Sequence, residues 1–137
     1  MQNPPPVQTA AKSSTGLDEN IAALLSYVFG WVSGLIFFLI EKDSRLVRFH
    51  AMQSLLFNVL VAVVGIALWI VLFVVFMIAS QISGALATLL SLVSILVWGV
   101  FLLGILAGFI LCLVKAFQGQ YFKLPVIGNF AEKFSAK

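Results

Sequence analysis

The chain has 137 residues, of which 62% are hydrophobic and 9% charged, and its formal net charge is +3. This composition excludes an ordinary soluble protein, because soluble domains carry about 25% charged residues and their helices need a polar face toward water. The eight basic residues are scattered beside apolar runs rather than gathered on one face, so we expect no nucleic-acid partner.

Residues 1–19 contain a proline triplet and many small polar residues, but no apolar segment. This pattern predicts a flexible N-terminal tail, and it lacks the apolar run and cleavage site of a secretory signal. Asp18 and Glu19 favour the start of a helix directly afterwards, because carboxylates stabilise the positive end of the helix dipole.

Two segments lack Asp, Glu, Lys and Arg altogether: residues 21–40 and residues 51–114. The first has the ~20 residues that a helix needs to cross a hydrocarbon core of about 30 Å. The second has one cluster of polar and turn-forming residues, Ser80–Gly84, which divides it into residues 51–79 and 85–114. We therefore expect an all-α, polytopic integral membrane protein with three transmembrane helices in a domain of residues 20–114. Four spans are the competing division.

After Val114 the chain mixes aromatic residues with lysines, and Pro125 and Gly128 interrupt any continuing helix. Phe130 and Phe134 then fall on one side of a short helix whose other sides are polar. Residues 115–137 are therefore predicted to form an interfacial amphipathic C-terminal segment at the level of the lipid headgroups.

Basic residues divide unequally in a three-span arrangement. The tail and the Ser80–Gly84 turn share one side of the membrane and contain only Lys12. The other side holds the remaining basic residues: Lys42, Arg45, Arg48, Lys115, Lys123, Lys133 and Lys137. The positive-inside rule then predicts a cell-membrane protein with its N-terminus outside and its C-terminus in the cytoplasm. Headgroup contacts are expected from Lys42, Arg45, Arg48, Lys115 and Lys123.

The start of the second predicted span places polar side chains on one helix face, together with Phe57. They are His50, Gln53, Ser54 and Asn58. Such groups are costly toward lipid, so this face is expected to point into the bundle or toward a wet cavity. Two readings stay open: hydrogen bonds between helices, or a face that binds or conducts a substrate.

Small residues recur every fourth position in two of the predicted spans. The first set is Ser26, Gly30 and Gly34; the second is Gly104, Gly108 and Cys112. Membrane helices associate through close packing at small residues, so both sets are predicted to be helix-packing ridges. They pack either within one monomer or between copies in a homo-oligomer.

Residues for catalysis or for a cofactor are not evident. The uncharged segments contain no carboxylate for a protease or a proton relay. One His and one Cys are too few for a zinc site, and neither a GxSxG motif nor a phosphate-binding glycine loop occurs. We expect no catalytic, metal or cofactor site, and hence no enzyme.

The charged connector and the helix after it, EKDSRLVRFHAMQS, resemble a signature of the Tic-twenty-like superfamily, small integral membrane proteins distantly like a chloroplast import component. The runs STGLDENIAALLSYVFGWVSGLIFFLIEKD and QGQYFKLPVIGNFAEKF are similar to the ends of the same family. The likeness covers most of residues 14–134. It implies an all-helical membrane protein with a part in protein translocation or membrane-complex assembly.

The residues and the resemblance together predict a non-enzymatic multi-pass membrane protein that serves as a scaffold, assembly or translocation component. Its expected partners are the lipid bilayer and either other membrane proteins or further copies of itself. The alternative is an oligomeric channel or small-solute transporter that uses the polar face of the second span. A lipid-binding module that uses the headgroup cations is a third candidate.

Overall fold

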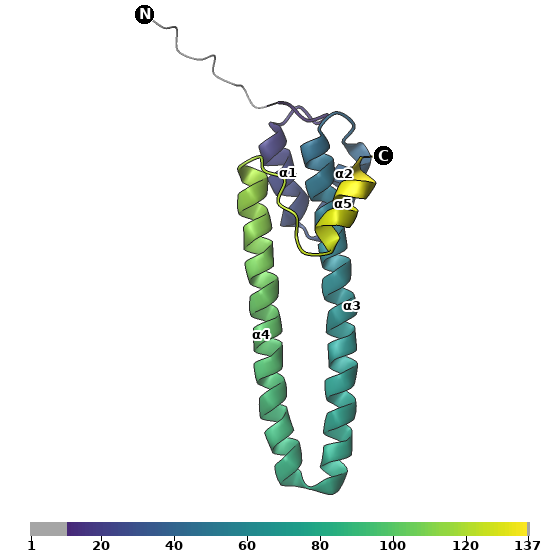
Figure 1. The fold of residues 1–137 in the computed structure, drawn as a ribbon, viewed down its shortest axis with the longest axis vertical. Helices are drawn as coiled ribbons and strands as arrows, with labels where there is room; N and C mark the ends of the chain where they lie inside the picture. Colours follow the sequence, from purple (N-terminus) through teal and green to yellow (C-terminus); the bar gives the residue numbers. More distant parts are fainter. Residues whose placement is uncertain (1–10, 137) are drawn as a thin grey trace, which may run out of the picture. The chain divides into compact units, whose positions relative to one another are not determined.

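The computed structural model describes residues 11–136, which form five helices and no β-strand (Figure 1). The helices are α1 (Glu19–Val28), α2 (Trp31–Ile40), α3 (Arg45–Ile82), α4 (Gly84–Phe117) and α5 (Ile127–Ser135). The prediction of an all-helical chain is confirmed. Residues 1–10 of the predicted flexible tail lie outside the described part. Residues 11–18 differ from that prediction, because Lys12 and Asp18 form a β-bridge and Ser14 hydrogen-bonds to Glu41.

The described residues divide into two compact units. Unit 1 comprises residues 11–56 and 112–136, and so contains α1, α2, α5, the first turns of α3 and the last turns of α4. Unit 2 comprises residues 57–111, which are the remaining parts of α3 and α4 and the turn at Ser83 between them.

The prediction of three spanning helices is wrong. Among residues 11–136, only α3 and α4 are long and apolar enough to cross a membrane. The segment predicted as the first span is instead two helices of 10 residues each, α1 and α2. At a rise of about 1.5 Å per residue each is ~15 Å long, which is half of a hydrocarbon core. Neither can cross it.

The break between α1 and α2 lies at Phe29 and Gly30. Gly30 has φ +61°, a left-handed conformation that glycine adopts without steric cost. The hydroxyl of Ser33 accepts a hydrogen bond from the Phe29 N–H at 3.1 Å and donates to the Ser26 carbonyl at 3.0 Å. The Ser54 hydroxyl of α3 donates to the Gly30 carbonyl at 3.1 Å. Serine hydroxyls thus replace hydrogen bonds that a continuous helix would have made.

The small-residue positions predicted as one ridge in the first span therefore have separate roles. Ser26 is fully buried in α1, and Gly30 forms the break rather than a helix face. Gly34 packs closely on another helix: a Cβ at this position would lie 2.9 Å from the Ala51 carbonyl oxygen of α3. Glycine at residue 34 thus lets α2 approach the backbone of α3.

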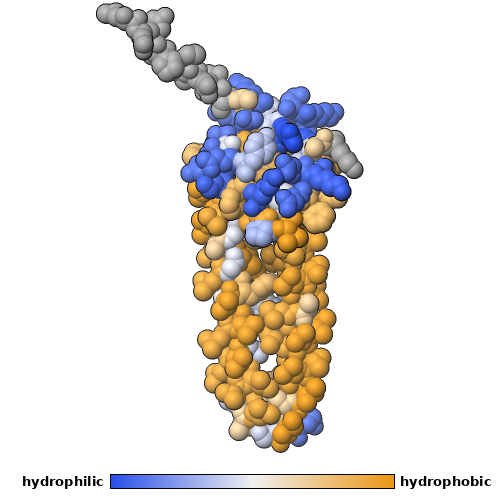
Figure 2. Space-filling view, viewed as in Figure 1, coloured by the Kyte–Doolittle hydropathy of each residue, from blue (hydrophilic) through white to orange (hydrophobic). Residues whose placement is uncertain are grey.

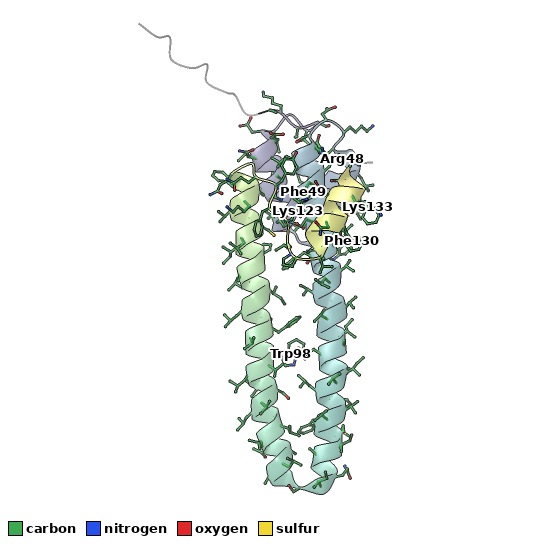
Figure 3. The ribbon with its side chains drawn as sticks, viewed as in Figure 1. Arg48, Phe49, Trp98, Lys123, Phe130 and Lys133 are labelled. Atoms are coloured by element: carbon green, nitrogen blue, oxygen red, sulfur yellow. The ribbon has the colours of Figure 1, made fainter. Side chains whose placement is uncertain are left out.

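A small hydrophobic core holds the short helices of unit 1 together. Phe49 and Met52 of α3 and Ala131 of α5 are its buried members, and Phe38 and Leu55 pack against them. Phe130 and Phe134 lie on the exposed side of α5, at 50% and 43% exposure, with their rings stacked (Figure 3). The amphipathic character predicted for this segment is thus present in the helix.

In unit 2, α3 and α4 run antiparallel and leave their outer surfaces apolar (Figure 2). The ring of Phe57 would lie 3.4 Å from a Cβ at Gly108, so this predicted packing position does face α3. A Cβ at Gly104 would meet nothing within 4 Å, so Gly104 makes no such contact. Trp69, Trp98 and Phe101 line an apolar groove of about 420 Å³ between the two helices (Figure 3).

Replacing Gly34 with alanine should destabilise unit 1. The added methyl group would overlap backbone atoms of α3, which cannot rotate away, and overpacking of this kind costs about 1–3 kcal/mol. Gly104→Ala is the matched control, expected to change stability by less than about 1 kcal/mol. Denaturant unfolding of both variants in the same detergent measures the difference. Equal midpoints would show that α2 does not depend on this close approach.

Candidate functional site

Three residues of the polar face predicted at the start of α3, His50, Gln53 and Ser54, lie in unit 1, where the face meets the chain after α4. Tyr27, His50, Gln53 and Cys112 form what we call the His50–Gln53 cluster, and each has 1% exposure or less. Tyr27 comes from α1 and Cys112 from α4, so this cluster joins three helices. Its other partners are backbone groups of residues 120–124.

His50 bridges α1 and the segment after α4. Its Nε2 lies 2.8 Å from the carbonyl oxygen of Gln120, which only accepts hydrogen bonds, so Nε2 carries the proton. In the neutral imidazole Nδ1 is then an acceptor, and the Tyr27 hydroxyl, 2.9 Å away, is its donor. The ring also packs edge-on against Phe49.

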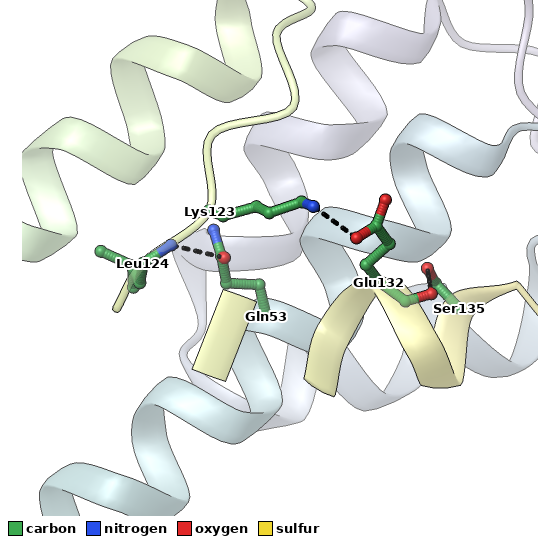
Figure 4. A network of polar contacts seen from close by, with 5 residues as sticks. All are labelled: Gln53, Lys123, Leu124, Glu132 and Ser135. Atoms are coloured by element: carbon green, nitrogen blue, oxygen red, sulfur yellow. Dashed lines mark hydrogen bonds and ion pairs between the residues drawn. The ribbon is translucent and has the colours of Figure 1, made fainter. Parts of the chain in front are cut away.

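Gln53 holds the segment after α4 through its whole amide group. Its Nε2 donates to the Phe122 carbonyl at 2.8 Å and to the Tyr27 hydroxyl at 3.2 Å, and its Oε1 accepts from the Leu124 N–H at 3.2 Å (Figure 4). Residues 120–124 are not helical, so their backbone groups need partners from elsewhere in the chain. Gln53 therefore supplies a donor and an acceptor to the backbone of this segment.

The remaining polar-face residues have different surroundings. Ser54 is fully buried and donates to the Gly30 carbonyl at the break between α1 and α2. Asn58 is half-buried and belongs to unit 2. Within the described residues, no buried side-chain nitrogen or oxygen lacks a hydrogen-bond partner. The polar groups of the His50–Gln53 cluster are thus paired inside the protein and closed to solvent.

A second cluster surrounds Glu41, which lies in the charged connector between α2 and α3. The Glu41 carboxylate is fully buried and accepts hydrogen bonds from the backbone N–H groups of Ser14, Asp43 and Ser44, all within 3.1 Å. The Ser14 hydroxyl donates to the same carboxylate at 2.7 Å. The Ser44 hydroxyl donates in turn to Glu19 of α1. We call Ser14, Glu41, Asp43 and Ser44 the Glu41 cluster.

Burial raises the pKa of Glu41, but the hydrogen bonds from Ser44, Ser14 and Asp43 outweigh burial, so the pKa lies below its ordinary value. Hydrogen bonds of this kind stabilise the charged form of a carboxylate. The ionised Glu41 therefore ties Ser14 to the residues just before α3. A sequence signal was present, since Glu41 directly follows an apolar helix, but its most distant donor, Ser14, lies 27 residues away along the chain.

Arg48, predicted to touch lipid headgroups, links three elements of unit 1 instead. Its guanidinium donates to the carbonyl oxygens of Glu41 at 2.8 Å and Ser135 at 3.3 Å, and it lies over the Phe38 ring at 4.7 Å (Figure 3). It thereby joins the ends of α2 and α5 to α3. The carbonyls at a helix C-terminus favour a cation, so both helix ends are stabilised.

The other predicted headgroup cations lie nearer the surface. Lys42, Arg45 and Lys123 are exposed, and Lys115 is half-buried with its ammonium group 3.0 Å from the Gln120 amide oxygen. Lys123 forms an ion pair with Glu132 of α5 (Figure 4). This contact holds the pKa of Glu132 below its ordinary value.

Residues 15–131 match a family described as the magnetosome magnetite crystal formation protein family. The chain is 38% identical over 125 residues to a UPF0132 membrane protein of Methanocaldococcus jannaschii, covering 90% of this chain and 94% of that relative. It is 34% identical over 117 residues to a UPF0132 membrane protein of Archaeoglobus fulgidus, covering 85% and 95% of the two chains. No solved structure matches the chain.

These comparisons give no support to the resemblance to the Tic-twenty-like superfamily. The connector motif that suggested it, residues 41–54, lies inside the region that matches the magnetosome magnetite crystal formation protein family. The comparisons do support the coarser part of the prediction, a family of small membrane proteins, through the UPF0132 relatives. The part in protein translocation that followed from the resemblance has no support from them.

The Glu41 cluster should weaken in acid. Because the folded pKa of Glu41 is lowered, its stabilisation is complete above the unfolded value of about 4.3 and is lost as the pH falls through the folded value. Hydrogen exchange of the Ser14, Asp43 and Ser44 amides, corrected for intrinsic rates, should show constant protection at neutral pH and loss below about pH 4. Glu41→Gln should lower this protection already at pH 7, whereas Glu132→Gln should not. Unchanged protection in Glu41→Gln would contradict the role of the carboxylate.

Proposed function

The chain belongs to the magnetosome magnetite crystal formation protein family, and from this membership we propose that it is a non-enzymatic component of a membrane assembly. In this role it binds other membrane proteins or further copies of itself through its membrane-embedded surface. No group of three or more His, Cys, Asp or Glu side chains within residues 11–136 is arranged to hold a metal ion. The proposal therefore assigns no iron-binding step to these residues.

The observation that carries the proposal is that the polar side chains at the start of α3 form hydrogen bonds within the chain. His50, Gln53 and Ser54 bond to Tyr27 and to backbone groups of the same chain, so they serve to shape unit 1. A transported solute would need such groups to be exposed along its path. The alternative of a channel built on this face therefore has no support from the geometry.

The surface of unit 2 supports the same role. Its outward residues on α3 and α4 are almost all aliphatic or aromatic, and Gly104 on α4 has no neighbour within 4 Å of an added Cβ (Figure 2). Membrane helices associate where small residues allow close approach, since hydrophobicity alone does not distinguish protein from lipid. This surface suits association with another membrane helix.

We expect both termini to lie in the cytoplasm. With two spans, every Lys and Arg falls on the side of the termini, and the turn around Ser83 has none. The earlier expectation of an outside N-terminus required a third span. Cysteines introduced at Thr9 and at the exposed Ala136, in a Cys112→Ser background, should both be labelled only after the cytoplasmic face is opened. A cysteine at Ser83 should be labelled from outside. Labelling of the two terminal positions from opposite faces would contradict two spans.

Photocrosslinking in cells tests the assembly role. A photoreactive residue at Val100 or Leu103, both exposed on α4, should give discrete products larger than the monomer. Gly104→Leu should reduce these products severalfold, because a bulky side chain prevents close approach, while Leu89→Ala serves as an exposed control on the same helix. Monomer alone at every position would refute the proposal.

Measurements of ion and solute flux distinguish the assembly role from transport. Vesicles containing the protein should show the same leak as empty vesicles. Gln53→Leu should leave that flux unchanged, and it should instead lower thermal stability, because the Phe122 carbonyl and the Leu124 N–H lose their partner. Flux that requires the protein and disappears in Gln53→Leu would favour the channel.

A further inference from the structure

Unit 1 has one cleft whose rim is rich in cations. It has a volume of about 490 Å³ and lies between the connector, the start of α3 and the end of α5. Its lining residues are Lys42, Asp43, Arg45, Arg48, Ser135 and Ala136. Three cationic side chains thus share the cleft with one carboxylate. We refer to it as the Lys42–Arg45 cleft.

Among the described residues, the groups near this cleft that would oppose an anion have partners within unit 1. The Asp43 carboxylate lies 2.9 Å from the Ser14 hydroxyl, whose single proton is shared with Glu41, so Asp43 keeps its negative charge. The Ser135 carbonyl, at the negative end of α5, accepts from Arg48 at 3.3 Å. Glu132, which lines a neighbouring cleft with Arg45, forms an ion pair with Lys123. Among residues 11–136, the lining of the cleft thus has three cationic side chains and one carboxylate, which is a surplus of positive charge.

The cations of the rim have complementary roles. Arg48 is positioned by its carbonyl partners and by the Phe38 ring, so it contributes a fixed positive charge at the wall of the cleft. Lys42 and Arg45 are exposed, so their side chains can close on a bound group. A guanidinium beside an ammonium is the usual combination for a phosphate, whose oxygens accept several charge-assisted hydrogen bonds.

The helix that forms one wall of the cleft also carries an apolar surface. Ser135 and Ala136 close the cleft at the end of α5, while Phe130 and Phe134 of the same helix are exposed. An exposed aromatic face on a short amphipathic helix belongs at the boundary between headgroups and acyl chains. At that boundary the phosphates of lipid headgroups are the most abundant anions.

We propose that the Lys42–Arg45 cleft binds a phosphate group, as a phosphodiester of an anionic lipid headgroup or as a small soluble phosphate ester. Lys42 and Arg45 bind the phosphate oxygens, and Arg48 provides the fixed charge behind them. The site is independent of the assembly role proposed above, since it lies in unit 1 and involves none of the exposed positions of α4.

Lipid binding to the full-length protein tests the site. The protein is placed in phosphatidylcholine nanodiscs containing increasing amounts of phosphatidylglycerol, and retained lipids are counted by native mass spectrometry. We expect saturable retention of phosphatidylglycerol. Removing one rim cation in Lys42→Gln should weaken it about fivefold, and Lys42→Gln with Arg45→Gln roughly thirtyfold, from about 1 kcal/mol per cation near a membrane surface. Lys115→Gln, which removes a cation of unit 1 outside the cleft, should change retention by less than about twofold.

A second arm identifies the source of the phosphate. Glycerol 3-phosphate or inorganic phosphate is added to the protein in pure phosphatidylcholine nanodiscs, and the thermal midpoint is recorded. A midpoint shift that Lys42→Gln reduces, without saturable lipid retention, assigns the cleft to a soluble phosphate ester. Lipid retention without such a shift assigns it to the headgroup. The absence of both responses, or equal losses in Lys42→Gln and Lys115→Gln, would overturn the proposal. The unliganded thermal midpoint of each variant verifies folding.

Discussion

Non-helical backbone near a membrane must find its hydrogen-bond partners inside the protein, and unit 1 is organised around this constraint. The chain leaves helical geometry at Phe29 and Gly30 and again between α4 and α5. Ser33 and Ser54 hydrogen-bond to backbone groups at the first break, and His50 and Gln53 hydrogen-bond to backbone groups at the second. One polar face at the start of α3 thus makes possible both the short α1–α2 pair and the return of the chain after α4.

Charged groups complete this arrangement at the surface of unit 1. The Glu41 carboxylate gathers N–H groups from the chain before α1 and from the start of α3, and Arg48 gathers carbonyl groups from the ends of α2 and α5. The Glu41 carboxylate thus binds N–H groups, which carry partial positive charge. The Arg48 guanidinium binds carbonyl oxygens, which carry partial negative charge. The proposed phosphate site depends on these contacts, because they hold the end of α5 and the connector beside the start of α3.

Local sequence patterns predicted much of the candidate site, but they did not predict which groups its side chains bind. Periodicity placed His50, Gln53 and Ser54 on one face and indicated that this face points inward, which agrees with their full burial. Hydrogen bonds between helices were one of the two readings, yet Gln53 binds chiefly the backbone of residues 122–124, about 70 residues away. Spacing along one helix carries no information about such distant groups. For the same reason the sequence places Glu41 in a charged connector but does not indicate that its carboxylate is buried.

The sequence by itself determined that the long helices belong in lipid and that the chain is helical, because hydropathy and the absence of charge are properties of each local segment. It could not determine the number of spans. An apolar run of ~20 residues is equally compatible with one crossing helix or two half-length helices. The left-handed Gly30, the Ser54 hydroxyl that binds its carbonyl and the close approach of Gly34 to α3 decided between them. These are contacts between distant parts of the chain, and they exist only once the tertiary structure has formed.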